Sequence, residues 1–162
     1  MTNVWCVRAE FGKFAQAFVK GGFAAIGWIE DKSLADCKNR DEIQVLYREA
    51  YPNDTSNIVI GQQVGQIALF LLEIQPGDIV ITPDSNTELL HHGTVEEGYR
   101  FEPNDPACPY MHRRNIKWQP EPLLRSELSV PLQNTMRSSL TVFSVSQVEE
   151  VLRLAGREGE IP

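Results

Sequence analysis

The feature that most constrains the fold is the apolar stretch from residue 57 to residue 83. Its apolar side chains recur at the three- and four-residue spacing of an α-helix, at Ile60, Val64, Ile67, Leu71 and Ile74. Further apolar side chains at Leu69, Phe70 and Leu72 widen this stripe almost all the way round. The pattern therefore predicts a helix that is largely buried and around which the rest of the chain packs.

The segment that follows this helix predicts a central β-hairpin. Gln75-Pro76-Gly77 ends the helix, because proline cannot continue the hydrogen-bonded ladder and glycine accepts a left-handed conformation. The β-branched run at 78–82 is typical of a core strand. A turn at 83–86 then allows residues 88–95 to return as the antiparallel partner.

The remaining patterns predict a mixture of helices and strands. Alternation over residues 3–8 predicts a half-buried strand, and Phe11, Phe14, Ala15, Phe18 and Val19 form a helical stripe. Strands are predicted at 23–29, 110–118 and 140–145, with a helix at 43–51. Ser146 and Glu149 match a capping box that would open a last helix. We expect one α+β domain over residues 1–156, and residues 157–162 to begin a linker.

Composition excludes several classes of protein. No apolar run reaches the ~20 residues that a membrane span needs. The three cysteines sit in no close pair, which favours reduced thiols and a cytoplasmic location. The formal net charge of -7 argues against broad electrostatic affinity for nucleic acid but leaves room for a small basic face.

Catalytic and metal-binding patterns are weak in this sequence. Cys108 and His112 have a Cys-x-x-x-His spacing, which is compatible with part of a zinc site or with a cysteine nucleophile and a histidine base. A structural zinc site needs two close ligand pairs, and the only further candidates are His91 and His92. We expect no metal, no cofactor and no catalytic centre.

Aromatic and basic residues point instead to nucleic acid. Trp28 follows a run of very small residues and precedes Glu30, so a planar group could lie against its indole, although a place in the core is an equal alternative. Arg113, Arg114, Asn115 and Lys117 form the densest basic stretch. Such a run is usually a solvated face, but it could also contact phosphates, together with Lys13, Arg125 and Arg137.

The order of these features resembles the EVE-like domains of the PUA superfamily, which are related to YTH domains. The resemblance rests on VWCVRA at 4–9, AIGWI at 25–29, YREAYP at 47–52, GQI at 65–67, IQPGDIV at 74–80 and LTVF at 140–143. The sequence is similar above all to the N-terminal reader domains of type IV, modification-dependent restriction proteins. The resemblance implies a PUA-like, curved, barrel-like β-sheet flanked by helices, with a concave pocket for a base.

The resemblance also implies a function and a set of site residues. It implies binding of double-stranded DNA whose modified base flips into an aromatic pocket, with an effector elsewhere in the native protein or complex. 5-Methylcytosine and 5-hydroxymethylcytosine are favoured, and 6-methyladenine is a further candidate. The positions that match the pocket are Arg8, Ala9, Glu10, Trp28, Ile29, Glu30, Thr82 and Asp84.

The chain departs from the family pattern at Ala68 and Pro83, where an aromatic residue is usual. The alternatives are a reader of modified RNA, or a small enzyme or ligand sensor that uses Cys108 and His112.

Overall fold

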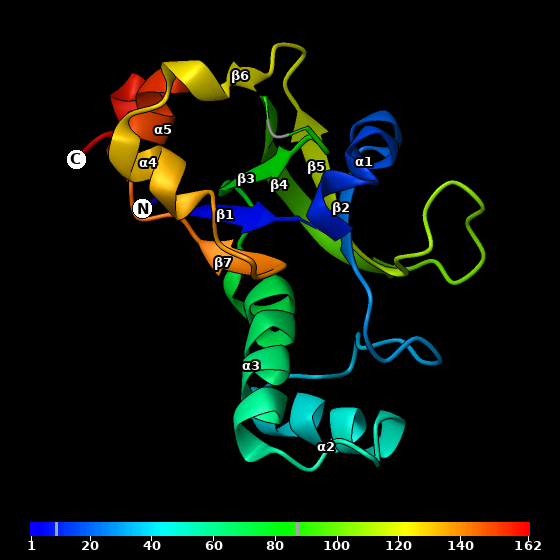
Figure 1. The fold of residues 1–162 in the computed structure, drawn as a ribbon. Coiled ribbons are helices and arrows are strands. Elements are labelled where there is room, and N and C mark those ends of the chain that lie inside the picture. The colour runs from blue at the N-terminus through cyan, green and yellow to red at the C-terminus, as the bar shows by residue number, and fades with distance from the viewer. Residues whose placement is uncertain (9, 87) are drawn as a thin grey trace.

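Residues 1–8, 10–86 and 88–162 are described by the structure, a computed structural model. Its centre is a single mixed β-sheet (Figure 1). The strands are β1 (Val4–Val7), β2 (Phe23–Ile26), β3 (Ile79–Pro83), β4 (Leu89–Phe101), β5 (His112–Trp118), β6 (Leu123–Leu124) and β7 (Val142–Ser144). Their order is β2-β5-β4-β3-β1-β7, with β6 paired to β4. The prediction of an α+β domain with a curved sheet flanked by helices is confirmed, but within the described residues the sheet stays open between β2 and β7.

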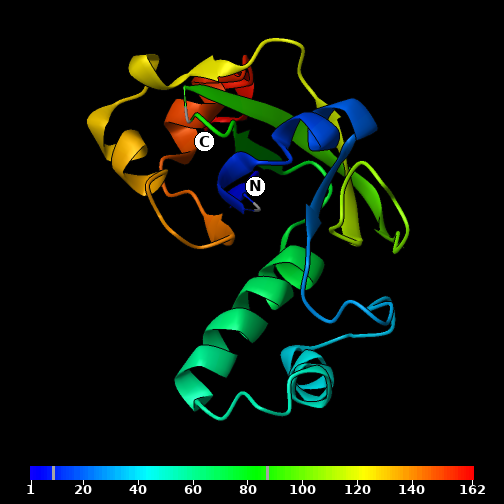
Figure 2. The same cartoon turned by 45° about the vertical axis from the view of Figure 1, so that its right-hand side comes forward.

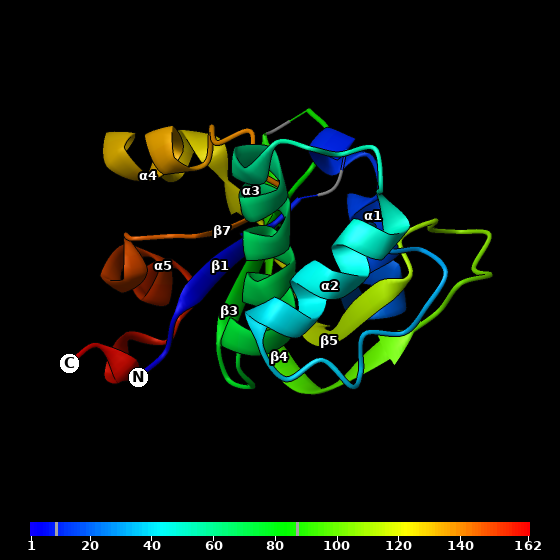
Figure 3. The ribbon, with the colours of Figure 1, turned by 90° about the horizontal axis from the view of Figure 1, so that it is seen from below.

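Helices surround this sheet on several sides. They are α1 (Ala15–Gly21), α2 (Arg40–Ala50), α3 (Asn57–Ala68), α4 (Val130–Thr135) and α5 (Val148–Leu154). Figures 1 and 2 show α3 extending away from the sheet with α2 beside its far end, while α4 and α5 lie together near the chain ends. Figure 3, seen from below, therefore shows α2 and α3 in front of the sheet. No helix in the described part of the chain is both long and apolar enough to cross a membrane.

The predicted hairpin of β3 and β4 is confirmed. The two strands are antiparallel, with Ile79 opposite Thr94 and Pro83 opposite Leu90. The first strand is more central than its alternation predicts, because β1 lies between β3 and β7 and all four of its residues are buried. Trp5 and Val7 belong to one apolar core and Val4 and Cys6 to another. A strand with cores on both faces has no solvent side, so the prediction of a half-buried strand is wrong.

The central helix changes its winding before it ends. Residues Leu69–Glu73 form one π-helical turn, in which the Ile74 amide donates to the Leu69 carbonyl at 3.0 Å. A π-turn holds an extra residue, so it rotates the following side chains relative to an α-helix. The α-helical spacing predicts that Leu71 is buried, but Leu71 is only partly buried and the neighbouring Phe70 is fully buried instead.

Two predicted helix starts are wrong, and the strand predicted at 23–29 ends at Ile26. The helix expected to include Phe11 begins only at Ala15, and Phe11 lies in a separate 3₁₀ turn, Glu10–Gly12, with its side chain 71% exposed. The expected capping box is also wrong, because α5 has Gln147 at its N-cap and no side-chain cap.

The segment predicted to begin a linker lies against the body of the domain. Arg157 donates to the Gly77 carbonyl at 2.9 Å and pairs with Glu160. Ile161 packs on the core that contains Val4 and Cys6. The effector that this linker would lead to stays a prediction.

Candidate functional site

Three of the predicted pocket residues line one cavity of about 300 Å³. Glu10, Trp28 and Glu30 contribute to it, together with Gly27, Tyr51, Tyr110 and Thr141. These residues come from the turns after β1 and β2, the end of α2, and the segments just before β5 and β7. Five chain segments that are distant in sequence thus converge on one cavity.

Aromatic side chains form three of the walls. Trp28, Tyr51 and Tyr110 are each partly buried and pack against the larger core. Gly27 lets the Tyr110 ring come close, because a Cβ atom at this position would lie 3.2 Å from Cδ1 of Tyr110. Phe14 supports the same ring edge-on, with the ring centroids 5.3 Å apart. Flat, partly exposed rings of this kind are the usual stacking surfaces for nucleobases.

The backbone at the rim of this cavity is strained. In the described part of the chain, the non-glycine residues with positive φ are Glu10 (47°), Phe11 (56°), Trp28 (62°) and Ile29 (45°). This conformation is unfavourable for residues with a Cβ atom, and most of all for β-branched isoleucine. Strained backbone persists only where surrounding contacts enforce it, and it is concentrated at functional sites.

A buried histidine holds the Trp28–Ile29 turn in place. His112 Nε2 lies 2.8 Å from the Trp28 carbonyl and 3.0 Å from the Ile29 carbonyl. Its Nδ1 lies 2.6 Å from the Tyr99 hydroxyl, which in turn accepts from the Leu34 amide. Burial lowers the pKa of His112. The ring is therefore neutral at pH 7, with Nε2–H donating to the two carbonyls and Nδ1 accepting from Tyr99.

The polar groups of the cavity consist of carboxylates and phenols. The Tyr51 hydroxyl accepts from the Ile29 amide at 2.9 Å, so its own proton can be donated to a ligand. Burial raises the pKa of Tyr51, and burial together with the Glu10 carboxylate raises the pKa of Tyr110. Both phenols are thus protonated donors at pH 7. Glu10 and Glu30 supply acceptors, and no lining residue that the structure describes is basic.

The other predicted pocket residues lie outside the cavity lining. Ile29 is buried beneath the rim, and Arg8 is buried with Nη1 donating to the Met136 carbonyl at 3.2 Å. Thr82 is buried in β3, and no partner for its hydroxyl occurs among the described residues. Asp84 lies 3.8 Å from Nε2 of His91. Ala9 is outside the described residues.

The predicted phosphate contacts of Arg113 and Arg114 are wrong. Arg113 is 3% exposed, pairs with Asp105 at 2.7 Å, donates to two backbone carbonyls and lies 4.0 Å over the Phe23 ring. Arg114 is 6% exposed and donates to the Phe70 carbonyl at 2.7 Å. The Asn115 side chain accepts a hydrogen bond from Arg100 and donates one to the Glu97 carbonyl. Lys117 is exposed, so its phosphate contact stays a prediction.

Cys108 and His112 do not form an activated pair. Burial raises the pKa of the Cys108 thiol, whereas a nucleophilic cysteine needs a lowered pKa. Both ring nitrogens of His112 are already engaged. Among residues 1–8, 10–86 and 88–162, no three potential ligands lie close enough together to hold a metal ion.

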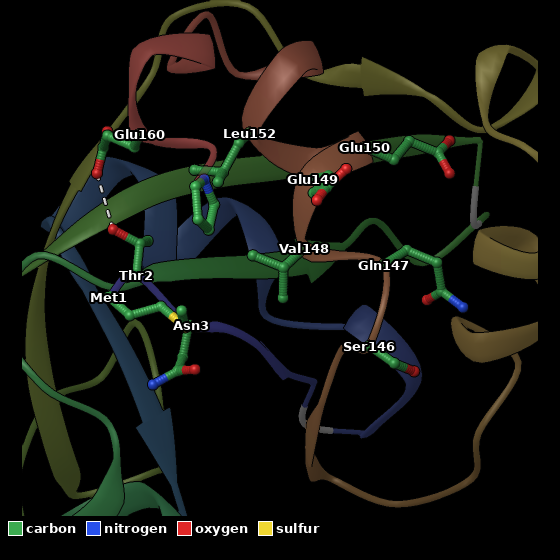
Figure 4. Close-up of a pocket in the computed structure, with 11 residues that line it drawn as sticks. Met1, Thr2, Asn3, Ser146, Gln147, Val148, Glu149, Glu150, Leu152 and Glu160 are labelled. Atoms are coloured by element: carbon green, nitrogen blue, oxygen red, sulfur yellow. Dashed lines mark hydrogen bonds between the residues drawn. The ribbon is translucent and has the colours of Figure 1, made fainter.

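A second cavity of about 440 Å³ lies between the N-terminal residues and α5 (Figure 4). The described residues of its lining include Glu149, Glu150 and Glu160 and no aromatic side chain. Glu160 accepts a hydrogen bond from the Thr2 hydroxyl at 2.7 Å, shown as a dashed line in Figure 4. This cavity offers no stacking surface for a base.

Sequence reasoning missed Tyr51 and Tyr110 as walls. Tyr51 belongs by spacing to the apolar stripe of α2, and Tyr110 follows a proline-rich loop. Only tertiary structure brings them to Trp28.

Comparison with known proteins shows a likeness to solved structures and a match to one family model. The crystal structure of the YTH domain of Zygosaccharomyces rouxii MRB1 protein in complex with N6-methyladenosine RNA is similar to this fold, with a TM-score of 0.50 and 9% sequence identity. The likeness covers 99% of this chain and 87% of that one. No curated protein matches the sequence. A family model described as "Domain of unknown function (DUF8426)" matches residues 5–149. The chain therefore belongs to the DUF8426 family.

Proposed function

We propose that this domain recognises a modified base in DNA by receiving it, flipped out of the duplex, between Trp28, Tyr51 and Tyr110. The observation that carries this proposal is the aromatic cavity of about 300 Å³ with its strained rim. The fold supports it, because a structure of similar fold is a YTH domain in complex with N6-methyladenosine RNA.

The chemistry of the lining favours a base that presents an amino group. Carboxylates accept from the N4 amino group of cytosine, and the N6 amino group of adenine offers a similar donor. Glu10 and Glu30 are such acceptors, and the protonated phenol of Tyr51 can donate to ring nitrogens or carbonyls. A methyl or hydroxymethyl group would add selectivity by filling apolar space, worth ~1 to 3 kcal/mol. The proposed ligand is thus 5-methylcytosine or 5-hydroxymethylcytosine, and 6-methyladenine presents a similar amino group.

The wider proposal assigns the domain a targeting role. It would perform no chemical step and would direct a restriction effector, a nuclease or an NTPase, to modified DNA. Extrusion of the base costs a few kcal/mol, which stacking in the cavity offsets. The alternative within the same class is a reader of modified RNA, which the complex of the YTH domain favours.

A sensor of a small cation is a second candidate. Aromatic rings with carboxylates and no basic residue also suit a methylated ammonium group, which is attracted to the ring faces. Such a ligand would use the same cavity but would need no nucleic acid.

A binding panel separates these functions. Matched DNA duplexes, single-stranded DNA and RNA should each carry cytosine or adenine in unmodified, methylated and hydroxymethylated form where that form exists. Tetramethylammonium and trimethyl-lysine complete the panel. We expect a modified DNA duplex to bind at least about tenfold more tightly than its unmodified counterpart, because the added group fills apolar space. Equal affinity for modified and unmodified duplexes, or tight binding of the cations alone, would contradict the proposal.

A further inference from the structure

Phe11 is the most unusual exposed side chain on the domain. It is 71% exposed although its neighbour Glu10 lines the aromatic cavity. Burying an aromatic side chain stabilises a fold, and a left-handed backbone at a residue with a Cβ atom destabilises it. The Phe11 side chain gains no stability from burial, and its backbone is left-handed, at φ 56° and ψ 35°.

The turn that carries Phe11 is fixed by packing. Gly12 lies so close to the turn after β3 that a Cβ atom there would be 2.5 Å from the Pro83 carbonyl oxygen. The Lys13 amide donates to the Glu10 carbonyl at 3.2 Å and closes the turn. On the other side, the Arg8 guanidinium, held by the Met136 carbonyl, lies 5.8 Å from the centre of the Phe11 ring. The ring therefore projects from a held position at the rim.

The surroundings of Phe11 suit a nucleic-acid duplex. Leu140, 41% exposed, directly precedes Thr141 of the cavity lining. Lys13, close to Phe11 in sequence, and Arg137, close to Leu140, are exposed cations of the kind that contacts phosphates. Arg113 and Arg114 cannot, because they are buried.

We propose that Phe11 is a wedge that enters the base stack of a DNA duplex and fills the gap left by the flipped base. This inference rests on the proposed function. Extrusion leaves a gap that is flat and apolar, and proteins that deform duplexes insert phenylalanine and other apolar side chains between base steps. The same turn thus places Glu10 in the cavity lining and the Phe11 ring where it can enter the duplex. A single strand has no such gap, so Phe11 selects duplex over single-stranded substrate.

The test compares duplex and single-strand affinity in variants of Phe11. Phe11→Asn removes the ring and suits the backbone, because asparagine tolerates the left-handed conformation. Phe11→Trp keeps a flat ring. Ile58→Ala, at a side chain that is 76% exposed near the start of α3, is the matched control for loss of an exposed apolar group. The probes are duplexes and single strands with 5-methylcytosine, 5-hydroxymethylcytosine or 6-methyladenine, with 2-aminopurine beside the modified base.

We expect Phe11→Asn to weaken duplex binding about tenfold or more and single-strand binding less than about twofold. The 2-aminopurine fluorescence should change less than with the unaltered protein, while Phe11→Trp and Ile58→Ala retain duplex affinity. Equal losses on duplex and single strand, or no loss on the duplex, would overturn the wedge. If Trp28→Ala abolishes modified-base preference while Phe11→Asn keeps full duplex affinity, the wedge alone is wrong. If the unaltered protein shows no preference for any modified probe, the proposed function fails and the wedge with it.

Discussion

The two arginines of β5 and the rim of the aromatic cavity reverse the usual places of charged and apolar side chains. Arg113 and Arg114 are enclosed by protein, and Arg113 has a carboxylate, two carbonyls and a ring as partners. Phe11, by contrast, is largely exposed, and Trp28 is only partly buried on strained backbone.

This difference separates the residues that stabilise the fold from those that bind. A buried cation with its partners satisfied is costly to disturb, because removing it leaves the partners unpaired. An exposed ring contributes little to folding, so its removal should leave the fold intact and reduce binding. Substitutions in the two regions should therefore produce opposite patterns of stability and affinity.

The largest effect on stability is expected at Arg113. Arg113→Ala leaves the Asp105 carboxylate and two carbonyls without their donor and should lower the free energy of unfolding by about 3 kcal/mol. Urea denaturation measures this loss. The control is Arg153→Ala, whose ion pair with Glu149 is exposed and should contribute less than about 1 kcal/mol. If Arg113→Ala kept full stability but bound DNA more weakly, Arg113 would contact phosphates and the structural role assigned to it would be wrong.

The next effect is expected on affinity, at Trp28. Trp28→Ala removes a stacking surface and should weaken binding of a modified duplex by ~1 to 3 kcal/mol. Trp118→Ala is the matched control, because Trp118 is also partly buried against the same core but lies outside the cavity. Fluorescence anisotropy and thermal melting of both variants measure affinity and stability together. Equal losses of affinity in the two variants would show that Trp28 acts only through the fold.

The smallest effect concerns pH. Burial lowers the pKa of His112 and of His92 in the folded protein, so both histidines bind protons more readily when the chain is unfolded. Stability should therefore fall as the pH decreases below about 6.5, by at most about 1.4 kcal/mol per pH unit for each histidine. Urea denaturation between pH 5 and 7.5 measures this slope. His112→Gln should reduce it, and an unchanged slope would exclude His112 as a source.

Local patterns in the sequence predicted much of the fold. The helix before Pro76 and the hairpin of β3 and β4 depend on short-range periodicity and on proline and glycine. The π-turn at Leu69–Glu73 and the burial of both faces of β1 depend on tertiary packing, which periodicity does not encode.

The candidate site was predicted only where its residues adjoin a recognisable element end. Trp28 and Glu30 follow a strand of small residues, and this pattern identified them as candidate site residues. Tyr51 and Tyr110 look like ordinary apolar positions, and nothing local connects them with Trp28. Arg113 and Arg114 form a charged run like that of a solvated face, whereas their partners at Asp105 and Phe70 are brought near by the fold.

The resonances of the three tryptophan indoles test the central claim most directly. The indole N–H of Trp5 donates to Asp78 and that of Trp118 to the Phe18 carbonyl, both outside the cavity, whereas Trp28 lines it. In a ¹⁵N-labelled sample, a duplex with the preferred modified base should shift the Trp28 indole signal strongly and leave those of Trp5 and Trp118 nearly unchanged. Its unmodified counterpart should shift none of them strongly. An unmoved Trp28 signal when the modified duplex is bound would contradict the assignment of this cavity as the base-binding site.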